Sequence, residues 1–304
     1  MADNIKYRFI QNVGDYFPSG YFGEDFLEKV QKCAGLSNED IKNLCSPFVR
    51  LQHDYDEYKN FIINHHPRVE DAIKKTHDFN TQLLKILGYE TDHAYQEHCI
   101  TGEDTEPIEM IPVRHILRQG QLVKMFVMEM QHLIAINDQE PAGLFEQQYE
   151  SEPDRNTKQQ KYSARQWRFV FELDKEKYRI SPAIINKAVT QIFLLPEDRR
   201  PHFILMLAGN VVFLFDKDKW ARGSYLQFSL DELFAQARVS AFRNYYALFH
   251  MLVSKQTLAA DGEMVLMDTI IEESYKNAYE VTKDLKEGVI FAVETLANEA
   301  LYYM

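Results

Sequence analysis

The sequence predicts a mixed helix-and-sheet protein of the α+β or α/β class, because helical and strand-like patterns occupy different parts of the chain. Apolar residues recur at helical spacing near both ends, and the middle holds short β-type runs bounded by turn residues. The 304 residues suffice for one large domain or two modest ones. We therefore expect an N-terminal helical segment over 1–87, a mixed-sheet domain over 88–235 and a helical connector over 236–304.

Helices dominate the expectation for the N-terminal segment. Residues 19–34 carry apolar side chains at helical spacing. Ser37 is a typical N-cap, and Asp40 falls in the following first turn, where a carboxylate favours the positive end of the helix. A further amphipathic helix is predicted over 71–87, and Gly88 stands where a helix-ending glycine is common.

The clearest strand signal of the middle region is a hairpin with arms over 202–208 and 211–216, joined by Gly209-Asn210. Both arms are almost continuously apolar, so we expect the hairpin to be buried on both faces. The other expected elements are a short strand over 88–90, β-type runs over 108–117 and 122–131, a loop over 146–160, a strand pair over 167–173 and 178–180, and a helix over 181–195.

The C-terminal segment is predicted to be helical in several pieces. Ser229 and Glu232 have the spacing of a capping box, and 242–253 is a helix rich in aromatic residues. We place the start of the last helix at Thr282, which can cap it. This helix reaches Met304 without the polar residues in which chains usually end, so we expect the protein to continue beyond it.

Charge and composition argue against several classes of protein. The net charge of −12 disfavours DNA binding by this chain alone, since basic side chains dominate contacts with phosphates. No apolar run reaches the roughly 18 residues that span a bilayer, and no leader pattern opens the chain. We therefore expect a cytoplasmic protein without membrane association. Cys33, Cys45 and Cys99 lack metal-type spacing and are expected to be reduced thiols.

The common nucleotide-binding and nucleophile motifs are absent. The sequence contains no Gly-x-x-x-x-Gly-Lys-Ser/Thr, no Gly-x-Gly-x-x-Gly and no Gly-x-Ser-x-Gly. Histidines near acidic residues, such as His93 and His98, match no zinc spacing and are interpreted as surface or packing residues. The stretch Asp-Lys-Asp-Lys-Trp over 216–220 is site-like, but we favour a solvated turn with Trp220 folded over the core.

The carboxylates of the middle region suggest a degenerate nuclease-like frame. Nucleases with a Pro-Asp…(Asp/Glu)-x-Lys core hold Mg²⁺ with carboxylates on adjacent strands and orient water with the lysine. Glu90 follows a helix and Glu129 ends a strand, as two such carboxylates would. Val113 and Gln131 occupy the Asp and Lys positions, however, and Glu109 is the candidate replacement carboxylate. We predict a PD-(D/E)XK-like fold that is inactive; in the simpler alternative, Glu129 faces solvent.

From about Arg200 the sequence resembles a known family. The similarity lies in the run over 200–216, in Lys219-Trp220, in Tyr225-Leu226-x-Phe228-x-Leu230-x-Glu232-Leu233-Phe234, in Glu272-Glu273-Ser274-x-Lys276-x-Ala278, in Asp284-Leu285-Lys286 and in Glu294-x-Leu296-x-Asn298-Glu299. These segments resemble the N-terminal region of large type II DNA-modification enzymes, the adenine-specific methyltransferases of restriction-modification and phage-defence systems. The resemblance implies a methyltransferase domain further along the parent protein, which would bind S-adenosylmethionine and DNA and act at an Asn-Pro-Pro-Tyr motif. This chain has no such motif.

Three functional hypotheses follow. The first is a non-catalytic N-terminal region of a bacterial DNA-modification methyltransferase, with an architectural or DNA-positioning role and no cofactor of its own. The second is an active Mg²⁺-dependent endonuclease that uses Glu90, Glu109 and Glu129. The third is a protein-interaction module that docks other subunits of a defence complex.

Overall fold

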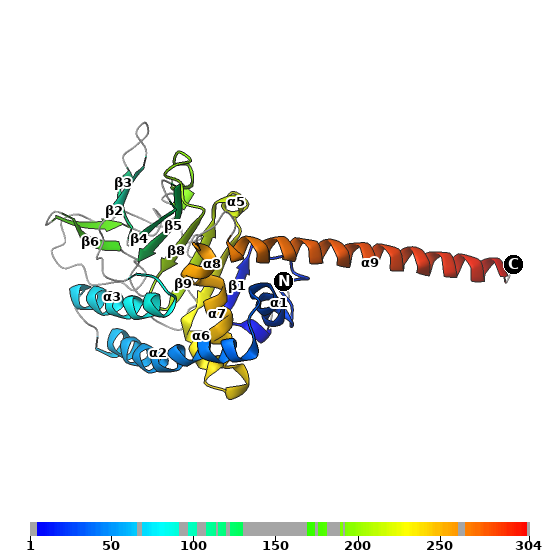
Figure 1. Cartoon of the computed structure of the whole chain (residues 1–304), viewed down its shortest axis with the longest axis horizontal. Helices are drawn as coiled ribbons and strands as arrows, with labels where there is room; N and C mark the ends of the chain where they lie inside the picture. The colour runs from blue at the N-terminus through cyan, green and yellow to red at the C-terminus, as the bar shows by residue number, and fades with distance from the viewer. Residues whose placement is uncertain are drawn as a thin grey trace.

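A computed structural model describes residues 5–65, 69–90, 97–101, 108–113, 115–119, 122–129, 169–173, 176–180, 189–190, 192–260 and 265–302. It contains a six-stranded sheet with helices packed beside it and one long helix, α9, that extends away from the body (Figure 1). This arrangement confirms the mixed α+β class. Several sequence expectations lie outside the described residues: the loop over 146–160, the first residues of the helix over 181–195, and the positions of His93 and Gln131.

The six-stranded sheet has the order β1-β10-β9-β8-β5-β4. Neighbouring strands are antiparallel except β5 and β8, which run parallel, so the sheet is mixed. Two further pairs, β2–β3 and β6–β7, form separate two-stranded sheets. The strands are β1 (Ile10–Val13), β2 (Glu97–Thr101), β3 (Ile108–Val113), β4 (His115–Gln119), β5 (Leu122–Glu129), β6 (Phe169–Leu173), β7 (Glu176–Ile180), β8 (Phe203–Leu207), β9 (Val211–Asp216) and β10 (Tyr225–Ser229).

The β8–β9 hairpin lies inside this sheet and confirms the clearest strand prediction. Gly209 adopts a φ of 69° in the turn, a left-handed conformation that glycine reaches without steric cost. Leu205, Leu214 and Leu226 are register partners on β8, β9 and β10, so their side chains share one face of the sheet. Every residue of β8 and β9 is buried, as expected for strands covered on both faces.

Two strand predictions differ from the structure. The run over 108–117 is not one strand, because β3 pairs with β2 while β4 forms the hairpin with β5. The proposed strand over 88–90 is not formed: Gly88 ends the preceding helix with a φ of 82°, as predicted, and Tyr89 turns into the core. The phenol of Tyr89 there donates to the carbonyl of Val253 at 2.9 Å.

The helices follow local capping signals where these are strong. Ser37 and Asp40 form a reciprocal capping box at the start of α2, as the sequence predicts. The helix expected over 19–34 is formed only in its second half, where Gly35 ends it at a φ of 64°. The helices are η1 (Ile5–Tyr7), α1 (Phe26–Ala34), α2 (Asn38–Asn64), α3 (Val69–Ile86), α5 (Lys217–Trp220), α6 (Leu230–Ala237), η2 (Ser240–Phe242), α7 (Tyr245–Val253), α8 (Lys255–Leu258) and α9 (Leu266–Tyr302).

Helix α9 corrects the expectation of a break before Thr282. It runs without interruption from Leu266 to Tyr302, and at about 1.5 Å per residue it is roughly 55 Å long. Thr282 lies within it and does not cap a new helix. A threonine inside a helix costs only a few tenths of a kcal/mol in propensity, which continuous backbone hydrogen bonding outweighs.

One hydrophobic core joins segments from the whole chain. The N-terminal region contributes strand β1, which pairs with β10, in addition to its helices. Aromatic rings fill the layer between the helices: Tyr58 stacks on Phe79 with ring centroids 4.9 Å apart, and Phe48 on Tyr246 at 5.4 Å. The core continues to Met267 and Ile270 on the first turns of α9, so the base of that helix is part of the folded body.

Candidate functional site

Glu129, the strongest candidate of the nuclease hypothesis, is buried at the end of β5. Its side chain is 3% exposed, and Oε2 lies 2.9 Å from Nδ1 of His77 on α3. The expectation that Glu129 faces solvent is therefore wrong. A buried carboxylate that contacts a histidine is held by the packing of α3 against the sheet, which gives Glu129 a structural role independent of any metal.

The other nuclease positions lie in different surroundings. Glu90 follows α3 and is exposed, with its carboxylate 3.4 Å from Nζ of Lys255. Glu109 and Val113 are on β3, which belongs to the β2–β3 sheet and not to the six-stranded sheet of Glu129. Glu90 and Glu129 thus lie in different environments, the first exposed beside Lys255 and the second buried against His77.

The structure brings a different set of polar side chains together where α9 leaves the body. Nε2 of His202 lies 3.8 Å from Asp216, 3.6 Å from Asp218 and 3.7 Å from Asp268, measured to the nearest carboxylate oxygen. We call these four residues the His202 cluster. They come from the residue before β8, the end of β9, the short helix α5 and the first turn of α9.

Backbone hydrogen bonds hold the cluster in place. The amide of His202 donates to the carbonyl of Lys124 on β5 at 2.9 Å, and its carbonyl accepts from the amide of Lys217 at 3.0 Å. Asp216 is the N-cap of α5, and its Oδ1 accepts from the amide of Asp218 at 2.8 Å. The positions of the imidazole and of two carboxylates are thus set by the sheet and by the first turn of α5.

Lys219 lies beside the cluster and is buried, with 7% exposed. Its ammonium donates to the carbonyl of Tyr16 and sits 4.2 Å from the ring centre of Tyr16 and 5.0 Å from that of Tyr275 on α9. The phenol of Tyr16 in turn donates to Oδ2 of Asp216 at 3.3 Å. The Lys219 ammonium therefore connects the loop after β1 with α9 through cation–π contacts.

We call the place where the first turn of α9 meets the His202 cluster and Lys219 the junction. Burial shifts the pKa values of Asp216 and Lys219 there. It raises the pKa of the Asp216 carboxyl, and the hydrogen bond from the Asp218 amide and the charges of His202 and Lys219 oppose it. Burial lowers the pKa of Lys219 to about 8, opposed by the charge of Asp216. The junction therefore contains ionisable groups whose charged forms are destabilised by loss of water.

Sequence reasoning missed this site. The prediction of a solvated turn over 216–220 is wrong for Asp216 and Lys219, which are buried. The prediction that Trp220 folds over the core is closer: its ring meets Phe215 edge-on at 5.1 Å, and Nε1 donates to Thr190. The sequence signal for this site is the run Asp216-Lys217-Asp218-Lys219 directly after the five apolar residues 211–215.

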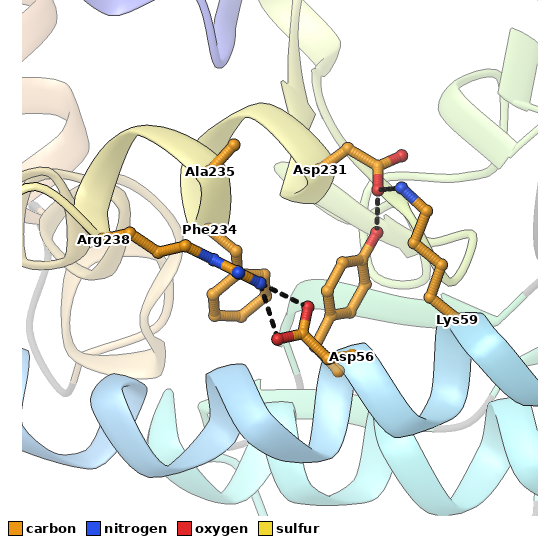
Figure 2. Close-up of a pocket in the computed structure, with 7 residues that line it drawn as sticks. Asp56, Lys59, Asp231, Phe234, Ala235 and Arg238 are labelled. Atoms are coloured by element: carbon orange, nitrogen blue, oxygen red, sulfur yellow. Dashed lines mark hydrogen bonds and ion pairs between the residues drawn. The ribbon is translucent and has the colours of Figure 1, made fainter.

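A second feature is a cleft of about 240 Å³ between α2 and α6 (Figure 2). Tyr55 and Lys59 both contact Asp231, the tyrosine hydroxyl at 2.9 Å, and Arg238 donates to both carboxylate oxygens of Asp56 at 2.7 and 2.6 Å. Each charged side chain that lines the cleft therefore contacts an opposite charge on the other helix. These contacts tie α2 to α6.

A third feature is the outer part of α9, residues 275–302. Up to Leu296, side chains on one side of this segment are apolar and exposed, with Leu285 64% and Leu296 66% accessible, and Ile290 and Phe291 are exposed on its other sides. Among the described residues, no helix is both long enough and apolar enough to cross a membrane. We call the following residues the apolar stripe: Val281, Leu285, Val289, Val293 and Leu296.

Comparisons with known proteins give no relative. No protein family, curated protein or solved structure matches this chain.

Proposed function

We propose that the chain is the non-catalytic N-terminal region of a bacterial DNA-modification methyltransferase, and that it acts as a scaffold that presents α9 to the catalytic domain. The observation that carries this proposal is the apolar stripe, which continues the buried face of the same helix. Leu285 follows Met267, and Val289 follows Ile271, by about five helical turns, so each pair lies on one line of the helix. Met267 packs in the core, whereas Leu285 is exposed.

Physical reasons favour a protein partner for the stripe. Helices in water gain most of their stability from packing of an amphipathic face, so a helix with an exposed apolar face is stabilised by a second apolar surface. The remaining sides of this segment carry charges of both signs, such as Lys283, Asp284 and Glu287, together with the exposed apolar residues Ile290 and Phe291. With a net charge of −12, the chain is poorly suited to bind a polyanion by itself.

The proposal assigns DNA and S-adenosylmethionine to the methyltransferase domain of the parent protein, and a positioning role to this chain. The nuclease alternative is weakened by Glu129, which is buried against His77. The degenerate nuclease-like frame is the less supported part of the proposal, because Val113 on β3 and Glu129 on β5 lie in different sheets.

The reading frame of the parent gene gives the first test. We expect an Asn-Pro-Pro-Tyr motif within several hundred codons after Met304, and its absence would overturn the proposal. In the full-length protein, we then expect Leu285→Ser with Leu296→Ser to lower the transfer of labelled methyl groups to adenine in plasmid DNA. Glu287→Ser with Glu294→Ser, on the polar side of α9, is the matched control. Equal activity of the two double variants would contradict the scaffold role of the stripe.

The stripe also supports a second candidate, docking of a separate subunit of a defence complex. In that case the Leu285→Ser/Leu296→Ser variant would lose a co-purifying subunit while methyl transfer by the full-length protein stayed unchanged. A gel-shift titration of this chain on duplex DNA at increasing salt separates both candidates from direct DNA binding, which would show a steep salt dependence.

A further inference from the structure

We infer that the His202 cluster binds a first-row divalent cation such as Zn²⁺. The ligands would be Nε2 of His202, Oδ1 of Asp216 and Oδ2 of Asp218; Asp268, 3.7 Å from Nε2 but outside this group of three, would move closer to serve as the fourth. Each of the first three residues offers one ligand atom, and these atoms lie within 4.8 Å of one another. An imidazole nitrogen with carboxylate oxygens is a ligand set that zinc uses in proteins.

The spacing of the ligand atoms carries the inference. The three distances from Nε2 of His202, between 3.6 and 3.8 Å, are too long for hydrogen bonds, which have N···O distances of about 2.7–3.2 Å. Ligands placed tetrahedrally around zinc at about 2.0–2.2 Å are roughly 3.3–3.6 Å apart. The distances from Nε2 are therefore a few tenths of an ångström longer than those of a zinc site, and the carboxylate oxygens of Asp216 and Asp218, within 4.8 Å of each other, would also move closer together on binding.

The ligands are also held as a site requires. Asp216 is 2% exposed, and its oxygens accept from the Tyr16 hydroxyl and from the amide of Asp218. These contacts orient the carboxylate and leave it further lone pairs for a metal, since an ionised carboxylate offers about four acceptor positions. Asp218, with a side chain that is 70% exposed, opens the cluster to solvent and gives an ion a path of entry.

Electrostatics favour a cation at this place. Three carboxylates surround one imidazole, so the cluster has an excess of negative charge when the imidazole is neutral. The nearby ammonium of Lys219 offsets part of this charge, but it donates to the carbonyl of Tyr16 and not into the cluster. A divalent cation would neutralise the remaining charge and would join α9, through Asp268, to β8 and β9.

The chain contains a natural control for this inference. His53, Asp54 and Glu57 also place ligand atoms within 4.8 Å of one another, but they lie on one side of α2, and none of them is buried. Their positions are set by one helix and by side chains that move freely in water. We therefore expect the His202 cluster to bind Zn²⁺ and the His53 group to contribute no comparable affinity.

The test is calorimetric titration of Zn²⁺ into the whole chain after treatment with a chelator. We expect one ion per chain, with affinity lowered at least tenfold by His202→Ala and unchanged by His53→Ala. Asp218→Asn, at an exposed position that does not threaten folding, should also lower the affinity and serves if His202→Ala does not fold. Co²⁺ bound to the wild-type chain should give visible bands typical of a four-coordinate site, and His202→Ala should abolish them.

Several outcomes would overturn the inference. They are the absence of Zn²⁺ binding, full affinity in both His202→Ala and Asp218→Asn, or preference for Mg²⁺ over Zn²⁺ in competition. The measurement uses neither DNA nor S-adenosylmethionine, so its result is independent of the proposed scaffold function.

Discussion

The β8–β9 hairpin and the outer part of α9 are both rich in apolar side chains, but the hairpin is buried and the outer part of α9 is exposed. Every residue of the hairpin strands is buried, whereas the apolar stripe of α9 is more than half exposed at Leu285, Val289 and Leu296. The hairpin is covered because strands pair on both of its edges and side chains pack on both of its faces. The stripe has the composition of a core helix but projects beyond the body that would cover it.

The difference shows which apolar residues stabilise this fold and which are available for a partner. Burial of apolar surface contributes to folding only where water is removed from it. Residues of the hairpin should therefore dominate the stability of the chain, and residues of the stripe should affect assembly and leave stability nearly unchanged. Substitutions at buried and exposed positions test this division.

Leu214→Ala should have the largest effect. Leu214 is fully buried in the middle of β9, between its register partners Leu205 and Leu226. Removing a buried leucine side chain leaves a cavity and should lower the free energy of unfolding by about 2–5 kcal/mol. Urea denaturation followed by circular dichroism measures the loss. A change below about 1 kcal/mol would mean that the hairpin is not the centre of the core.

Glu129→Ala should have the next largest effect, because it removes the partner of His77 inside the structure. Losing one hydrogen bond costs about 0.5–1.5 kcal/mol, and more where one partner is charged. Glu90→Ala is the matched control, since its surface pair with Lys255 is worth about 0–1 kcal/mol. If plasmid cleavage with Mn²⁺ were present in the wild-type chain and lost in Glu129→Ala at unchanged stability, Glu129 would be catalytic and not structural.

The free energy of unfolding should depend on pH in a way that shows whether the ammonium of Lys219 is buried. Its folded-state pKa is about 8, below the ordinary value of 10.5, so between these values the unfolded chain binds more protons than the folded chain. The free energy of unfolding therefore gains a term that rises with pH above about 8, by at most about 1.4 kcal/mol per pH unit. Lys219→Met should remove this term.

The free energy of unfolding is measured for wild type and Lys219→Met at pH 8, 9 and 9.5. The difference between the two proteins isolates the contribution of Lys219 from that of other titrating groups. Measurements stay below pH 10 because Tyr16 and other buried phenols, whose pKa values are raised by burial, act in the opposite direction there. Parallel curves for the two proteins would show that the ammonium of Lys219 is hydrated in the folded chain.

Leu285→Ala should have the smallest effect on the chain by itself. The side chain is 64% exposed, and leucine and alanine are both good helix formers, so the free energy of unfolding should change by less than about 0.5 kcal/mol. Measured beside Leu214→Ala, this substitution compares the same chemical change in the two regions. A large loss of stability would mean that the stripe is already covered in solution.

The parts of the fold that depend on local chemistry could be predicted from the sequence. Ser37 begins α2, Gly88 ends α3, and Gly209 turns the hairpin, because caps and turns are determined by a few neighbouring residues. Strand β1 escaped prediction because four residues are too few to show a period, and its pairing with β10 is a contact between distant parts of the chain.

The His202 cluster could not be predicted for a related reason. His202, Asp216 and Asp268 meet only after β8 pairs with β9 and α9 packs on the core, and no local spacing records that meeting. The nuclease positions show the converse problem: Glu129 has the expected place at the end of a strand, but its neighbour His77 comes from a helix far away in the sequence. A motif gives residue types, whereas the chemistry depends on contacts made by the whole fold.

The length of α9 beyond its base has a mechanical consequence (Figure 1). The helix is fixed only at its base, where Met267 and Ile270 pack in the core and Asp268 lies close to His202. With an outer arm of roughly 40 Å, a tilt of about 10° at the base would move the tip by about 7 Å. A change of charge at the junction that altered the angle of α9 only slightly would therefore shift whatever is bound near its end by more than one helical turn.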